Sequence, residues 1–230
     1  MIPTAETPLP IPSPLLQLPA GYSLTWRLDL RRSPALYLLL NVLGVGLLLA
    51  GGWLVSSWLS WLRPAALQGG LWGEGVSQNG WNWIGMLLGV FVGMLMLHEG
   101  LHGLFFWVFT RQRPHFGIGP GYFYACAPQW YIPRRQALVV MLAPAVGITL
   151  AGLLALAVLP TDWLLPVSLL VILNISGAVG DLYVALRSIR LSPESLYHDT
   201  GHVMEVYSLE QGHTAGEESR HPELSNPKER

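Results

Sequence analysis

The chain has 230 residues, of which 51% are hydrophobic and only 12% are charged, about half the charged fraction of an ordinary soluble domain. This composition argues against a typical soluble protein and indicates an integral membrane protein. The net charge of −1 provides no basic face for nucleic acid. The single cysteine, Cys126, cannot form an internal disulfide.

The first twenty residues contain six prolines and lack the basic start and uninterrupted apolar stretch of a signal peptide. We predict that residues 1–20 form a flexible segment in front of a membrane domain at 21–208. Four segments of that domain are apolar over the roughly 20 residues that a spanning helix needs: 35–62, 83–109, 137–159 and 163–186. The predicted fold class is therefore an all-α polytopic membrane protein with four transmembrane helices.

The arginines predict the orientation of these helices, because short loops rich in arginine stay in the cytoplasm. Nine arginines of the membrane domain precede the first helix, separate the second from the third, or follow the fourth. They are Arg27, Arg31, Arg32, Arg111, Arg113, Arg134, Arg135, Arg187 and Arg190. The opposite side carries only Arg63. We therefore predict a multi-pass protein of the plasma membrane with both termini in the cytoplasm.

Three polar segments on the predicted cytoplasmic side have the character of strands. Apolar and polar residues alternate from Leu24 to Arg31, which is the period of a half-buried strand. Residues 117–127 suit a hairpin or a short strand, and residues 202–207 could form a further strand. These segments predict a small cytoplasmic β element. Residues 209–230 are polar, with almost no apolar residue to bury, and predict a disordered tail.

The second predicted helix contains the sequence His98-Glu99-Gly100-Leu101-His102. At about 3.6 residues per turn the two histidines lie on one helix face, where both can bind one zinc ion. Glu99 is adjacent and can serve as the general base for a water activated by the metal. A glutamate in the middle of a span costs roughly 2.5 to 3.5 kcal/mol on insertion scales, which favours metal binding over a chance match.

Catalytic zinc sites usually have three protein ligands, so one more is required. The candidates are His115, Asp162, Asp181, His198 and Asp199, together with the later glutamates. Asp181 is the only carboxylate in a later predicted span, and its distance from Arg187 puts it in the same cytoplasmic half of the membrane as His98. Asn174, two turns earlier, either orients a ligand or a substrate carbonyl, or forms an interhelical hydrogen bond.

These motifs resemble a family of bacterial membrane zincin peptidases of unknown function, related to the site-2-protease-like intramembrane zinc metalloproteases. The resemblance covers residues 85–208 and is carried by the segments at 98–102, 143–144, 174–181, 199–201 and 205–207. It implies His98, His102 and Asp181 as zinc ligands and Glu99 as the general base. The Asp-Gly pair usual in the site-2 group is Asp181-Leu182 here, and the preceding Asn-Pro element is absent.

The leading hypothesis is thus a zinc-dependent endopeptidase that acts in or beside the bilayer on a membrane protein or peptide. The alternative is a non-catalytic membrane protein that holds its metal for structure or regulation. Neither hypothesis involves a nucleic acid, and neither specifies an oligomeric state.

Overall fold

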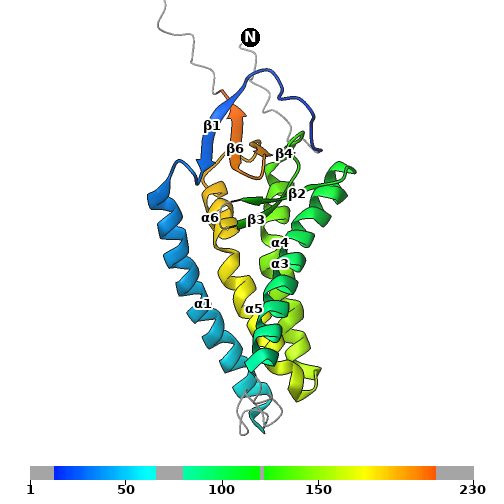
Figure 1. Ribbon diagram of the computed structural model, residues 1–230. Helices are drawn as coiled ribbons and strands as arrows, with labels where there is room; N and C mark the ends of the chain where they lie inside the picture. Colours follow the sequence, from blue (N-terminus) through cyan, green and yellow to red (C-terminus); the bar gives the residue numbers. More distant parts are fainter. Residues whose placement is uncertain (1–12, 66–79, 120–121, 211–230) are drawn as a thin grey trace, which may run out of the picture.

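The computed structural model describes residues 13–65, 80–119 and 122–210. Most of these residues are helical, and the strands gather at one end of the helices (Figure 1). The helices are α1 (Pro34–Leu62), α3 (Gly80–Thr110), α4 (Arg134–Val158), the short 3-10 helix η1 (Thr161–Trp163), α5 (Leu164–Gly177) and α6 (Val179–Ser188). The strands are β1 (Tyr22–Asp29), β2 (His115–Gly119), β3 (Tyr122–Cys126), β4 (Tyr131–Pro133), β5 (Leu196–Asp199) and β6 (Val203–Leu209).

Three helices, α1, α3 and α4, are each long and apolar enough to cross a membrane. Their mean hydropathies are 2.2, 1.8 and 2.3. Large apolar side chains cover their outer surfaces, as at Trp53 and Met96, which are 73% and 72% exposed. Such surfaces match a lipid environment better than water. The first three predicted spans therefore correspond to these helices, within a few residues at each end.

The fourth predicted span is not the single continuous helix that we expected at 163–186. It consists of η1, α5 and α6, and the two parts bend by 43° at a break next to Ala178. The ψ of Ala178 is 3°, outside the helical range. Gly177 and Gly180 flank this residue, and glycine is among the weakest helix formers. The prediction missed the break because residues 163–186, although they include Asn174 and Asp181, are long and apolar enough for one span.

The strands form one four-stranded antiparallel sheet in the order β1-β6-β5-β4 and a separate hairpin, β2–β3. The strand predicted at 24–31 corresponds to β1, the hairpin at 117–127 to β2–β3, and the strand at 202–207 to β6. Strands β4 and β5 were not predicted. Three chain segments contribute to this end of the molecule: one before α1, one between α3 and α4, and one after α6.

The N-terminal segment, expected to be flexible, contacts the sheet within its described part. Leu15 exchanges two backbone hydrogen bonds with Tyr131, of 2.9 and 2.8 Å. The predicted tail lies outside the described residues from 211 onward.

Two buried apolar clusters hold the helices together. One lies beneath the four-stranded sheet and includes Phe106, Val140, Met141, Val184 and Val206. The other lies toward the opposite end and consists of Val55, Leu59, Leu156, Leu164 and Val171. Beside the second cluster, the guanidinium of Arg63 donates to carbonyls of Leu156 and Leu159. These carbonyls belong to the end of α4, where a positive charge is favourable.

Candidate metal centre

His98 and His102 lie on the inner face of α3, one turn apart. Both side chains are buried, and their ring centroids are 5.0 Å apart. Helical geometry accounts for this pairing, because residues four apart in sequence are neighbours on a helix surface. Two basic side chains are thereby brought together inside the helix bundle.

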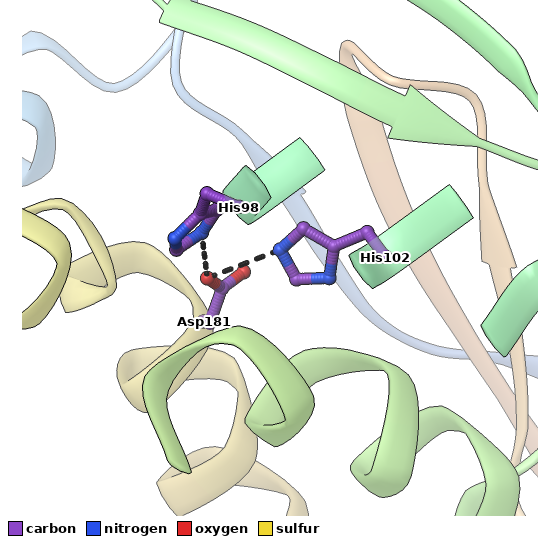
Figure 2. A group of neighbouring side chains, drawn as sticks. All are labelled: His98, His102 and Asp181. Carbon is purple, nitrogen blue, oxygen red and sulfur yellow. Dashed lines mark hydrogen bonds and ion pairs between the residues drawn. The ribbon is translucent and has the colours of Figure 1, made fainter. Parts of the chain in front are cut away.

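Asp181 approaches this pair from the first turn of α6. Its Oδ2 atom lies 3.1 Å from Nε2 of His98 and 3.3 Å from Nε2 of His102, as Figure 2 shows. The break at Ala178 is what makes Asp181 an N-terminal residue of a new helix, and carboxylates are stabilised there by the free backbone N–H groups. Residues 83 positions apart in sequence thus meet at one point.

The opposite nitrogen of each imidazole is occupied by an oxygen acceptor. Nδ1–H of His102 donates to the backbone carbonyl of Val140 at 2.9 Å. Nδ1–H of His98 donates to Oδ1 of Asn174 at 3.0 Å. The amide group of Asn174 cannot be reversed without loss, because its Nδ2 donates to the carbonyl of Pro144 at 3.1 Å. A neutral imidazole held in this way has its lone pair on Nε2, the atom that faces Asp181.

This donor set fits a zinc ion. The two Nε2 lone pairs and a carboxylate oxygen converge, and all three atoms lie within 4.8 Å of one another. Ligand atoms about 2.0–2.1 Å from a tetrahedral zinc stand roughly 3.3–3.4 Å apart, close to the distances given above. With both imidazoles neutral, three acceptors face each other, and a dication between them would offset their repulsion. Asp181 keeps 24% of its side chain exposed, so the group is not sealed.

Glu99 lies beside His98, His102 and Asp181, where it lines both a cavity and a neighbouring groove. A cavity of about 250 Å³ is lined by Glu99, His98, His102 and Asp181; it has room for several waters at about 30 Å³ each. An apolar groove of about 400 Å³, between α3 and the β2–β3 hairpin, also has Glu99 in its wall. The backbone of Ala125 in β3 is a hydrogen-bond neighbour of the Glu99 carboxylate. Glu99 can therefore act on a molecule in the cavity or in the groove.

The turn between β5 and β6 covers the cavity together with the hairpin. The hydroxyl of Tyr122 is hydrogen-bonded to Nδ1 of His202 at 3.0 Å. This bond joins the β2–β3 hairpin to the turn between β5 and β6. Gly201 has a φ of +80°, and a Cβ at this position would collide with the ring of Tyr124. Asp199 also lines the cavity, and burial raises the pKa of its carboxyl to about 6. Its Oδ1 accepts the backbone N–H of Gly201 at 2.7 Å.

The other sequence candidates for a third ligand lie elsewhere or face other partners. His115 begins β2 opposite Cys126, and Asp162 lies in η1 at the far end of the helices. His198 faces two oxygen acceptors, because its Nε2–H donates to the Pro128 carbonyl at 2.9 Å and its Nδ1 lies 3.4 Å from Oε2 of Glu205. Within the described ranges, Asp181 is the carboxylate that joins the histidine pair. Burial raises the pKa of the Cys126 thiol to about 12, so this cysteine stays protonated.

One functional group escaped the sequence reasoning altogether, namely the carbonyl of Val140. Backbone atoms carry no residue signature, yet a signal was present. Pro144 stands inside the predicted third helix, and a proline leaves the carbonyl four residues earlier without its helical donor. That free carbonyl is the acceptor for His102.

Comparison with known proteins supports the same chemistry. Residues 91–196 match a family described as "Putative zincin peptidase". The matched segment includes the motif at 98–102 as well as Asn174 and Asp181. The match supports a relation to zincin peptidases and hence zinc as the metal. No curated protein and no solved structure matches the chain.

Proposed function

We propose that the chain is a zinc-dependent endopeptidase that cleaves membrane proteins or peptides in or beside the bilayer. The observation that carries this proposal is the convergence of two Nε2 lone pairs and the Asp181 carboxylate next to Glu99. The long apolar helices and the family match support it.

His98, His102 and Asp181 would hold the zinc. When bound, zinc supplies Lewis acidity, which makes water nucleophilic near neutral pH and polarises a peptide carbonyl. Glu99 accepts the proton that the attacking water loses and delivers it to the leaving amine nitrogen. Glu99 has the position for this role, because it lines the same cavity as the three other side chains.

The groove between α3 and the hairpin offers a path for the substrate. Its lining is apolar apart from Glu99 and Tyr124, and includes Leu95, Met96 and Phe116. Ile118 of the hairpin is 73% exposed. The hairpin is a two-stranded sheet without a third strand among the described residues, so an extended peptide can add to its edge through backbone hydrogen bonds. An apolar segment lying there would pass Glu99.

The cavity lies at the end of the helices that carries the sheets and most of the arginines. The arginine distribution favours a cytoplasmic location for this end. We therefore propose that substrates are cut near the cytoplasmic surface of the plasma membrane, with both termini of the chain on that side.

The test uses the purified full chain in lipid nanodiscs and cells that express matched variants. Glu99→Gln preserves the shape of the side chain but removes the base. We expect one zinc per chain in the wild type and in Glu99→Gln, and none in His98→Ala. Peptide fragments of membrane proteins that depend on the wild type should fall by about 10²- to 10⁴-fold in Glu99→Gln cells, the usual contribution of a general base.

Wild-type cleavage by Glu99→Gln would refute the role of the base. If no fragment depends on the wild type, while His98→Ala loses both zinc and the native fold, the metal is structural. That result would favour the non-catalytic alternative.

A further inference from the structure

Pro144 interrupts the hydrogen-bond ladder of α4 beside both histidines. In a regular helix the carbonyl of Val140 would accept the N–H of residue 144. Proline has no N–H, so this carbonyl is left without its helical donor inside an apolar core. Nδ1–H of His102 fills that place at 2.9 Å. An unpaired carbonyl in this environment would be costly, which makes the contact persistent.

The carbonyl of the same proline holds the partner of the other histidine. Asn174 is fully buried, with 0% exposure, and its Nδ2 lies 3.1 Å from the Pro144 carbonyl and 3.3 Å from Oγ1 of Thr149. With both amide hydrogens used, Oδ1 is directed at Nδ1 of His98. Pro144 of α4 is thereby linked to both imidazoles, to His102 through the Val140 carbonyl and to His98 through Asn174.

We propose that Pro144 is a positioning residue that sets the tautomer and ring orientation of His98 and His102 together. It acts on His102 through the carbonyl it releases at Val140, and on His98 through its own carbonyl and Asn174. The result is that both Nε2 atoms face Asp181. This inference rests on the proposed zinc site, but it does not depend on whether the site cleaves peptides.

The test measures metal binding to the full chain in nanodiscs, with Zn²⁺ in competition with a chelator and Co²⁺ as a spectroscopic probe. Asn174→Leu removes the acceptor for His98, and loss of such an outer contact typically weakens metal binding by about 10- to 100-fold. Asn174→Asp keeps an acceptor facing Nδ1–H of His98 but loses the hydrogen bond that holds the amide to the Pro144 carbonyl, so zinc affinity should recover only in part and lie between those of the leucine variant and the wild type. Rescue by aspartate would not occur if Asn174 only joined helices.

Pro144→Ala returns an N–H to the Val140 carbonyl, which then competes with His102. We expect zinc affinity to fall by about tenfold and the visible spectrum of bound Co²⁺ to shift. The thermal midpoint of the metal-free protein should stay the same or rise, because alanine is a far better helix former than proline. A structural role predicts that stability and zinc affinity fall together. A positioning role predicts that zinc affinity falls while the thermal midpoint stays the same or rises.

Pro166→Ala is the matched control. Pro166 lies in the first turn of α5 and outside the lining of the cavity that contains both histidines, so zinc affinity should not change. Wild-type zinc affinity and Co²⁺ spectra in folded Asn174→Leu and Pro144→Ala would overturn the inference while leaving the zinc site intact. A wild type that binds no zinc would overturn the inference and the proposed function together.

Discussion

Helix α1 and the bent pair α5–α6 lie against each other, yet the buried polar residues of the pair bond differently from Asn41 and Ser60 of α1. In α1, a continuous helix of 29 residues, Asn41 donates to the carbonyl of Tyr37 and Ser60 to that of Ser56. Both bonds close within the helix. In α5–α6, Asn174 and Asp181 reach across to α3 and α4. The side chains that reach the histidines of α3 mark the site, whereas Trp58 and Ser176 donate to carbonyls of other helices without lining the cavity.

The largest effect is expected from Asp181→Ala, which removes the ligand candidate of the bent pair. Zinc binding and peptide cleavage should be lost. Wild-type protein with free zinc at 100 times its Kd should gain about 2.7 kcal/mol of stability, and the variant should gain none. Zinc stoichiometry and unfolding midpoints with and without zinc check this. Full zinc affinity in the variant would show that Asp181 is not a zinc ligand.

The second largest effect is expected from filling the cavity beside the break between α5 and α6. Gly180 lines the cavity, and a Cβ there would meet nothing within 4 Å. Gly180→Leu should fill this space and displace the substrate, with a fall in kcat/KM of about 100-fold, while zinc affinity is retained. Gly180→Ala serves as the smaller control. Equal losses of zinc and activity in the leucine variant would show that the fold at the break was damaged instead.

A smaller effect is expected from α1, where packing rather than chemistry is at stake. Leu59 is completely buried against Leu156, Leu164 and Val171. Leu59→Ala should lower the free energy of unfolding by about 2 kcal/mol through the cavity it creates. Zinc affinity of the folded protein should be unchanged. A weaker zinc site would mean that α1 takes part in positioning the ligands.

The smallest effect is expected from Asn41→Leu, the counterpart in α1 of the buried Asn174. Asn41 is exposed on the helix surface, so its loss should change stability by less than about 0.5 kcal/mol and leave zinc binding untouched. Thermal unfolding and the zinc competition measurement apply here as well. A drop in zinc affinity would break the contrast between the two spans.

The sequence predicted the long elements well, because their signals are extended. Runs of apolar residues located α1, α3 and α4, and alternation located β1. Strands β4 and β5 have only three and four residues, too few to establish a period. The break at Ala178 was missed because Gly177 and Gly180 are common in membrane helices, and the packing of α6 against α4 and α1 is not visible in the sequence.

The site was predictable where side chains define it. The motif spacing predicted that His98 and His102 lie on one helix face. The short distance from Asp181 to Arg187 predicted that Asp181 lies in the same half of the membrane as His98. The structure places these three side chains together, and their role as ligands is our proposal. The carbonyl of Val140 and the covering turn around Gly201 depend on backbone positions in three dimensions, which residue types do not reveal.

The pairing of β1 with β6 determines when the four-stranded sheet can form during translation. Tyr22 lies opposite Leu209, so the first strand of the sheet leaves the ribosome almost an entire domain before its neighbour. Until residues 196–209 have been translated, the turn that covers the cavity does not exist. Contacts between such distant segments form slowly. A nascent chain therefore completes its long helices before the strands β5 and β6 can enclose the cavity beside His98 and His102.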